Sequence, residues 1–105
     1  MLSYISPMSP LRTALYNTIR LIPRGKVATY GILAKHFHTS PRAIASMLAA
    51  NTLLDTYPCY RIIHTDGRIG GYREGTEEKI RRLYADGIKT VGGKIDLGKH
   101  EFTKF

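Results

Sequence analysis

The sequence predicts a small, mainly α-helical domain of the winged helix-turn-helix-like class, with a three-helix core, a C-terminal helix and a short β-hairpin. Three observations lead to this prediction. Four segments carry apolar residues at helical spacing, and each begins beside a Ser or Thr that can cap a helix. Two of these segments are joined by only four residues, and one Asp-Gly pair lies between short apolar runs. Because 105 residues suffice for one core, we treat residues 1–105 as a single domain.

The first helix is expected to begin at Ser9-Pro10, where Ser can serve as the N-cap and Pro as the first helical residue. Its apolar positions follow at near-helical spacing: Leu11, Leu15, Ile19 and Leu21. The run 22–25, Ile-Pro-Arg-Gly, ends it. After a brief extended stretch at 26–28, Thr29 can cap a second helix over residues 30–37.

The third helix is expected to begin at Ser40-Pro41 and to run to about Ala50. It has two unlike faces. Ile44, Met47 and Leu48 form an apolar stripe that suits a core contact. The opposite face carries mainly small side chains with one long cation: Arg42, Ala45, Ser46 and Ala49. Such a face can enter a DNA groove with the arginine reaching inward, and the alternative is that it packs on another helix.

The connection 37–40 is short enough to make the second and third helices a helix-turn-helix pair, with the third helix as the candidate reader of DNA. Further on, Thr65-Asp66-Gly67 lies between the apolar runs 61–64 and 68–69, which predicts the hairpin. Thr76 is expected to cap the last helix, whose buried stripe would be Ile80, Leu83 and Tyr84 and whose end would be Gly87. Residues 88–105 lack a strong period, so we expect a basic tail on the surface.

Composition restricts the function further. Sixteen Lys and Arg against eight Asp and Glu give a net charge of +8 and a sequence pI near 9.9, which favours a polyanionic partner such as nucleic acid over a merely soluble basic protein. No apolar run is long enough to span a membrane, and the first residues do not have the pattern of a signal peptide, so we expect a cytoplasmic protein without a membrane partner. The four histidines share no ligand spacing with the cysteine or with carboxylates, and we expect no metal.

Cys59 is the only cysteine of the chain, so it can form neither an internal disulfide nor a zinc site by itself. It is therefore either a nucleophile or a small core residue. Among the histidines, His64 is the one near enough in sequence to serve as a base for it.

Four motifs, in this order and at this spacing, resemble the C-terminal, active-site domain of the O6-alkylguanine-DNA alkyltransferases. They are Thr29-Tyr30-Gly31, Pro41-Arg42-Ala43, Pro58-Cys59-Tyr60-Arg61 and Gly70-Gly71-Tyr72-Arg73. The resemblance covers residues 9–87, and it is to the minimal form of the family, without the additional N-terminal domain that many members carry. It implies binding of duplex DNA through the minor groove, eversion of a damaged guanine and irreversible transfer of its alkyl group to a cysteine.

The resemblance also implies roles for individual residues. Cys59 would accept the alkyl group, and Arg42, 17 residues before it, would fill the gap that the everted base leaves. Asn51 would link the recognition helix to the active-site segment, Tyr30 would support eversion beside the target phosphate, and Tyr72 would line the base pocket. The remaining expected DNA and lesion contacts are Pro58, Arg61, Gly71, Ala45 and Ala49.

The chain departs from the family's motif directly after the cysteine. The family has a histidine there, which helps to generate the thiolate through water and is oriented by a glutamate. This chain has Tyr60 in the histidine's place and Asp86 in the glutamate's place. A phenol with a pKa near 10 is a poor base for a thiol with a pKa near 8.5. We therefore expect slower transfer, sustained by Arg61, a helix end or the basic surface.

Three hypotheses follow for the function. The first is a suicide alkyltransferase that acts once, without a cofactor, as a monomer on double-stranded DNA containing O6-alkylguanine. The second is an alkyltransferase-like sensor, which binds the lesion without transfer. The third, from a different class, is a helix-turn-helix transcriptional regulator whose cysteine is structural. We favour the first because the nucleophile is present.

Overall fold

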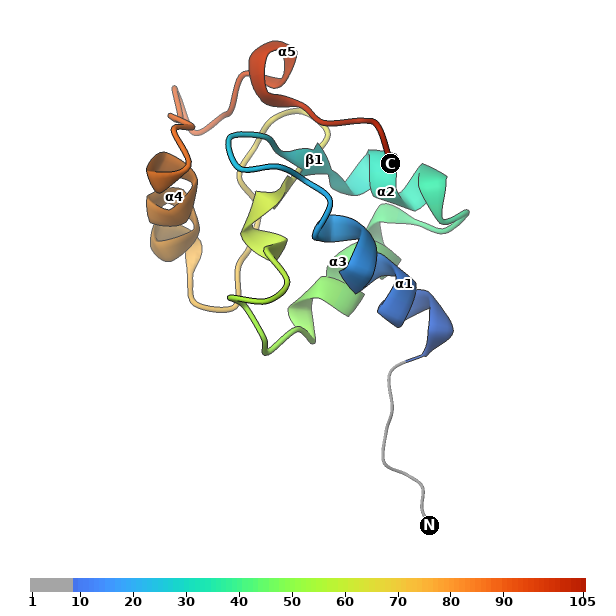
Figure 1. Ribbon diagram of the computed structural model, residues 1–105. Coiled ribbons are helices and arrows are strands. Elements are labelled where there is room, and N and C mark those ends of the chain that lie inside the picture. Colours follow the sequence, from blue (N-terminus) through green and yellow to red (C-terminus); the bar gives the residue numbers. More distant parts are fainter. Residues whose placement is uncertain (1–8) are drawn as a thin grey trace.

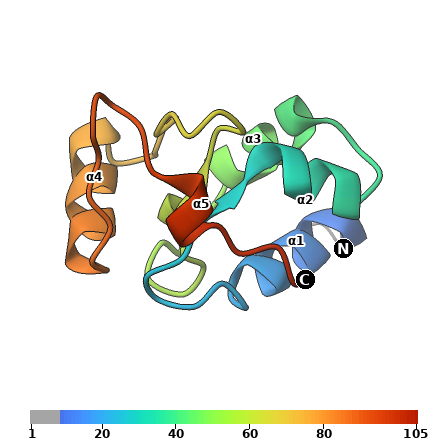
Figure 2. The same ribbon diagram turned by 90° about the horizontal axis from the view of Figure 1, so that it is seen from above.

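The computed structural model describes residues 9–105. Its elements in chain order are α1 (Pro10–Ile19), β1 (Ala28–Thr29), α2 (Tyr30–His36), α3 (Pro41–Ala49), the 3-10 turn η1 (Cys59–Arg61), β2 (Ile62–Ile63), α4 (Thr76–Ala85) and α5 (Leu97–His100). Helices α1, α2 and α3 form one group, and α4 lies at the other end of the molecule (Figure 1). The segment that carries η1 and β2 lies between them (Figure 2). No helix within residues 9–105 is long and apolar enough to cross a membrane.

Three helix starts follow the predicted local chemistry. The hydroxyl oxygens of Ser9, Thr29 and Ser40 each accept a hydrogen bond from the backbone amide three residues later, which satisfies an amide that the helix itself leaves unpaired. The turn between α2 and α3 contains His38, whose φ of 56° lies in the left-handed region. The predicted helix-turn-helix pair is therefore present, with α3 as its second member.

The two strands form a sheet that separates two apolar clusters. Ala28 pairs with Ile62 and Thr29 with Ile63, in parallel. Because successive side chains of a strand point to opposite faces, Ile62 packs in one cluster with residues of α1, α2 and α3, whereas Ile63 packs in the other with Leu83 and Ile88. The Cys59 turn directly precedes β2, so burial of both isoleucines fixes its position.

The predicted hairpin is wrong in its pairing. The turn over 64–67 forms, and the His64 amide donates to the Arg68 carbonyl at 2.9 Å, but no ladder extends from it. Ile62–Ile63 instead pairs with Ala28–Thr29, 34 residues earlier, and Arg68 makes an isolated antiparallel bridge with Lys94. Burial on both faces explains the difference. A strand that lies between the two apolar clusters buries both of its isoleucines, and this stabilises it more than a solvent-exposed hairpin would.

Several side chains differ from their predicted environments. Thr76 is the first residue of α4 rather than its cap, because Gly75, with a φ of 98°, occupies the cap position. Leu11, Leu21 and Tyr84 are exposed, the last at 63%. On α4, the buried face that Tyr84 was expected to share with Leu83 is instead completed by Lys79, which is fully buried.

The C-terminal segment is also more ordered than a surface tail. It buries Ile88 and Ile95 in the second cluster and contains α5. The Val27 amide donates to the His100 carbonyl at 2.9 Å, and the Phe102 amide donates to the Val27 carbonyl at 2.7 Å. This segment thus lies beside the β1 edge of the sheet.

Candidate active site

Cys59 lines a pocket of about 300 Å³ between α3, the start of α2 and the glycine-rich bend 70–75. Its walls are aromatic and apolar with two basic side chains at their edge: Tyr30, Ala45, Leu48, Ala49, Cys59, His64, Gly71, Tyr72 and Arg73. We call this cavity the thiol pocket. It brings together six of the predicted site residues, namely Tyr30, Ala45, Ala49, Cys59, Gly71 and Tyr72.

The small side chains of α3 explain why the pocket exists. Ile44 and Leu48 pack inward and anchor the helix, while Ala45 and Ala49 leave room beside it. The Arg73 guanidinium donates to the Ala49 carbonyl at 3.0 Å and so ties the bend to the end of α3. The mouth of the pocket is therefore held between a helix end and a bend.

Asn51 fixes the segment that carries Cys59 through side-chain hydrogen bonds. Its side-chain amide donates to the Tyr57 carbonyl at 3.1 Å and to the Cys59 sulfur at 3.5 Å, and its oxygen accepts from the Leu53 amide at 2.9 Å. Only 1% of this side chain is exposed, so these partners replace water. The same segment packs on α1 through Tyr57, whose ring lies 5.1 Å from that of Tyr16.

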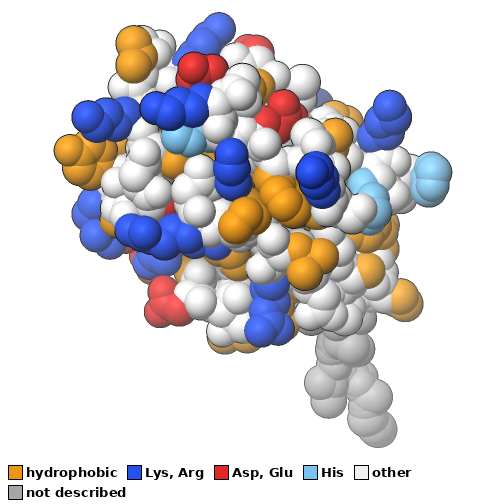
Figure 3. Space-filling view, turned by 45° about the horizontal axis from the view of Figure 1, so that its top comes forward, with side chains coloured by type: hydrophobic (Ala, Val, Ile, Leu, Met, Phe, Trp, Pro, Cys, Tyr) orange, Lys and Arg blue, Asp and Glu red, His pale blue; other side chains and the backbone are white. Residues whose placement is uncertain are grey.

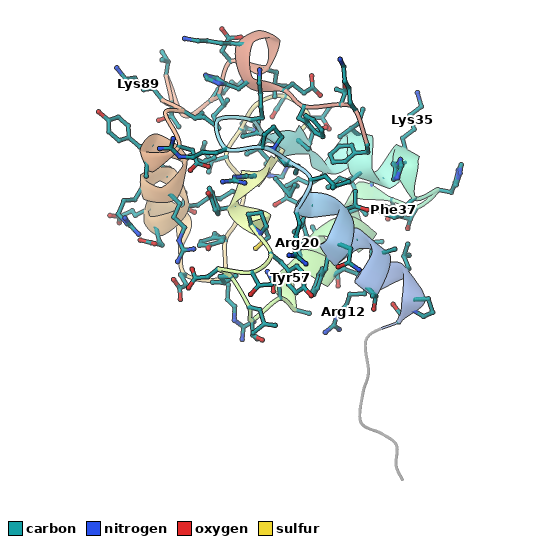
Figure 4. All side chains as sticks on the ribbon, in the orientation of Figure 1. Arg12, Arg20, Lys35, Phe37, Tyr57 and Lys89 are labelled. Atoms are coloured by element: carbon teal, nitrogen blue, oxygen red, sulfur yellow. The ribbon has the colours of Figure 1, made fainter. Side chains whose placement is uncertain are left out.

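Arg20 lies beside the same tyrosine on the outer side. Its guanidinium is 5.9 Å from the centre of the Tyr57 ring, and Figure 4 shows the two side chains together near the lower end of the segment that leads to Cys59. The end of α1 therefore supports the approach to the active-site turn.

Burial raises the pKa of the Cys59 thiol, and the hydrogen bond from Asn51 and the positive charge of Lys79 oppose this rise. Burial likewise raises the pKa of the surrounding phenols, including that of Tyr72 to about 12, so they remain protonated hydrogen-bond donors at neutral pH. The hydroxyl oxygen of Tyr72 is buried and has no hydrogen-bond partner among residues 9–105. It is a free donor at the pocket wall.

Lys79 is the residue that sequence reasoning missed. Its ammonium group is fully buried and donates to the carbonyl of Ile62 in β2 at 2.6 Å and to that of Gly71, which lines the thiol pocket, at 3.1 Å. No acidic side chain of residues 9–105 forms an ion pair with it, and burial lowers its pKa to about 8. A lysine is read as a surface residue in a helical pattern, so the one available signal was its position on the same face as Leu83.

The residues beside the cysteine face a second cavity. Pro58, Tyr60, Arg61 and Asp86 line a polar pocket of about 530 Å³ on the other side of η1. The Tyr60 hydroxyl donates to Asp86 at 2.8 Å, and the Arg61 guanidinium donates to the same carboxylate oxygen at 3.0 Å. Burial and this hydrogen bond raise the pKa of Tyr60, so it stays a protonated phenol at neutral pH and is not available to accept the proton of the thiol.

Arg42 lies outside both cavities. It is exposed in the first turn of α3 and forms no hydrogen bond or ion pair with residues 9–105. Its side chain is therefore available to an external partner. Within the same part of the chain, no three His, Cys, Asp or Glu side chains are close enough together to hold a metal ion.

A family model described as the DNA-binding domain of 6-O-methylguanine DNA methyltransferase matches residues 10–88. The chain is 43% identical over 97 residues to a bifunctional methyltransferase/endonuclease of Picrophilus torridus, covering 90% of the chain and 33% of that protein. It is 41% identical over 80 residues to a DNA base-flipping protein of Thermus thermophilus, covering 76% of the chain and 54% of that protein.

Among solved structures, the O6-methylguanine-DNA methyltransferase of Pyrococcus kodakaraensis superposes with a TM-score of 0.71 at 38% identity, over 76% of this chain and 47% of that one. The chain thus spans between a third and about half of the length of these relatives. The family match does not favour the hypothesis of a transcriptional regulator. On the sequence motifs, the shape of the thiol pocket and these matches, the chain belongs to the 6-O-methylguanine DNA methyltransferase family, with its DNA-binding domain over residues 10–88.

Proposed function

We propose that the protein repairs DNA by accepting the alkyl group of O6-alkylguanine on Cys59, after binding in the minor groove and flipping the damaged base into the thiol pocket. The observation that carries this proposal is the position of the single thiol on the wall of a pocket lined by Tyr30 and Tyr72. Enzymes that act on a base must take it out of the stack, and aromatic and apolar walls are what receive it.

The transfer is a displacement at carbon. The Cys59 sulfur forms a bond to the alkyl carbon, the bond between that carbon and O6 breaks, and its electron pair remains with the base. The base leaves as ordinary guanine after it takes up the proton that the thiol lost. The product thioether is stable, so each molecule acts once, and no cofactor takes part.

Lys79 supplies the positive charge that the reaction requires. The thiolate is the nucleophile, and a thiol with the ordinary pKa near 8.5 is only about 3% ionised at pH 7. The Lys79 ammonium stabilises the thiolate electrostatically, and the Asn51 amide donates a hydrogen bond to the same sulfur. These two groups take the place of the family's histidine, since Tyr60 faces the other cavity.

The DNA-binding surface is formed around α3. Arg42, free of internal partners among residues 9–105, enters the duplex and occupies the gap left by the flipped base, and the small residues of α3 allow close approach. Figure 3 shows Lys and Arg side chains distributed over one face of the molecule, which suits contacts with phosphates. We expect the protein to bind as a monomer.

A lesion sensor without transfer is the alternative. Two observations favour it: burial raises the pKa of Cys59, and Tyr60 and Asp86 do not provide a base. Binding and eversion would be unchanged in such a protein, and the lesion would be passed on.

Mass spectrometry separates the two. The protein is incubated with duplex DNA containing one O6-methylguanine, with the Cys59→Ala variant as the control. A gain of one methyl group on Cys59, absent from the variant, supports repair. An unchanged mass, together with tighter binding to damaged than to undamaged duplex, rules out transfer and leaves the sensor. An unchanged mass together with equal affinity for both duplexes overturns both.

A further inference from the structure

Arg82 lies one turn after Lys79 on α4, with its side chain between the thiol pocket and the second cavity. Residues three apart on a helix share a face, so both cations point from α4 towards the active-site segment. Only 20% of the Arg82 side chain is exposed, although it is charged. A long cation is rarely covered to this extent unless it has several partners.

Three ion pairs connect Arg82 to three segments. Its guanidinium lies 2.8 Å from Glu78 on α4 itself, 3.3 Å from Asp55 in the connection before Cys59, and 3.5 Å from Glu74 in the glycine-rich bend. Each pair is weak on its own, because Asp55 and Glu74 are exposed to solvent. Together they fix the connection and the bend relative to one guanidinium group.

The same guanidinium contacts one aromatic ring from each cavity. Its central carbon lies 5.6 Å from the centre of the Tyr72 ring, in the thiol pocket, and 6.0 Å from that of Tyr60, the residue directly after Cys59. These distances are within the range of cation–π attraction. The Arg82 guanidinium therefore lies beside a residue of the pocket wall and a residue of the η1 turn, and pairs with both flanking loops.

We propose that Arg82 is a positioning residue of this site: it holds the Tyr72 wall and the Cys59 turn at the separation that admits a flipped base. The inference rests on the proposed function, since it concerns the same pocket. Its physical reason is that α4 lies at the far end of the molecule from α1, α2 and α3 (Figure 2), so that side chains reaching back from α4 must set this wall. The positive charge of Arg82 also opposes the rise in the pKa of Cys59 that burial causes.

The test compares Arg82→Met and Arg82→Lys with Arg81→Gln. Arg81 is a matched control, because it is the adjacent arginine, its side chain is 68% exposed, and among residues 9–105 its only ion pair is with Glu78. Two quantities are measured for each protein. One is the pH midpoint of Cys59 alkylation by iodoacetamide without DNA, and the other is the ratio of affinities for duplexes with and without O6-methylguanine.

We expect Arg82→Met to raise the pH midpoint and to reduce the affinity ratio by about tenfold, because both the charge and the wall are lost. Arg82→Lys should restore the pH midpoint but not the affinity ratio, since an ammonium group supplies the charge without the planar fork that joins three segments. Arg81→Gln should change neither quantity.

An Arg82→Met protein that is less stable but keeps both quantities would overturn the proposal, because Arg82 would then have only a structural role. If Arg82→Met does not fold, Arg82→Lys decides, and a lysine variant that retains the full affinity ratio overturns it equally. A wild type that neither prefers damaged duplex nor gains a methyl group from it would instead mean that the proposed function fails. The alkylation profile, which needs no DNA, would still show whether Arg82 acts on Cys59.

Discussion

The side-chain amide of Asn51 lies 3.5 Å from the sulfur of Cys59 and also bonds to the backbone on either side of the connection that leads to it. One buried amide therefore both shapes the segment that carries Cys59 and contacts its thiol. The position of the thiol and its pKa depend on the same residue.

Asn51→Ala should lower the free energy of unfolding by about 2–3 kcal/mol, because the Tyr57 carbonyl and the Leu53 amide lose their buried partner. It should also raise the pH midpoint of Cys59 alkylation, since a hydrogen bond to the thiolate is lost. Urea unfolding and iodoacetamide kinetics measure the two effects. Asn51→Asp keeps the acceptor for Leu53 but places a negative charge near the sulfur, and an unchanged midpoint in that variant would contradict the proposed contact.

Tyr60→His should speed methyl transfer, because an imidazole with an ordinary pKa near 6.5 would stand beside Asp86, where the phenol is now bound. Tyr60→Phe should leave the transfer rate unchanged and cost about 1 kcal/mol of stability through the lost hydrogen bond. The rates are read from the mass of the protein at intervals after mixing with damaged duplex. A histidine variant that is no faster would mean that a side chain facing the second cavity does not reach the sulfur, or that Lys79 already activates the thiol fully.

Lys79 should make stability depend on pH above about 8. In the folded protein its pKa is about 8, against an ordinary value of 10.5, so between these values the unfolded chain binds more protons. The free energy of unfolding therefore rises with pH in this window, by up to about 3 kcal/mol, as the penalty for a buried charge is relieved. Urea unfolding of Cys59→Ala from pH 7 to 10.5 measures the rise without interference from the thiol.

The control for this experiment is the double variant Cys59→Ala/Lys79→Met, in which the rise should be absent. Parallel curves for the two proteins would show that Lys79 titrates near its ordinary pKa in the folded protein, and would contradict the penalty for burying its charge.

Arg42→Ala should weaken base flipping more than overall DNA binding. The side chain is exposed at the start of α3, where it can fill the gap in the duplex. Fluorescence of 2-aminopurine at the target position reports flipping, and anisotropy of labelled duplex reports binding. Lys35→Ala removes one exposed charge from the last turn of α2 and should lower binding without a separate effect on flipping (Figure 4). If Arg42→Ala lowers both quantities in parallel, Arg42 is a phosphate contact.

The helix starts were predictable because their signals are local. Ser9, Thr29 and Ser40 act on amides three residues away, so the sequence alone contains both partners. The parallel pairing of Ala28 with Ile62 was not predictable in this way, because it depends on two clusters that form only when distant segments meet. The Asp66-Gly67 turn formed as expected, but a turn does not determine what its flanking strands pair with.

The residues of the candidate site differ in the same way in how far the sequence predicted them. The resemblance to the family named as site residues six of the nine residues that line the thiol pocket, because the family's spacing carries that information, but it did not name Leu48, His64 or Arg73 as such. Lys79 was not predicted, because its buried ammonium group depends on two hydrogen-bond acceptors, the carbonyls of Ile62 and Gly71, that lie elsewhere in the chain. Arg82 also looked like an ordinary surface cation, and its partners Asp55 and Glu74 come from loops without periodicity.

The backbone of Val27 is paired on both its amide and its carbonyl by the C-terminal segment at His100 and Phe102. An unpaired sheet edge is a template onto which a strand from a second molecule can add, and this pairing occupies that position beside β1. Because β1 continues directly into α2, whose first residue is Tyr30, this pairing closes the sheet edge next to one wall of the thiol pocket. The C-terminal segment thus protects this edge against misassembly with a second molecule.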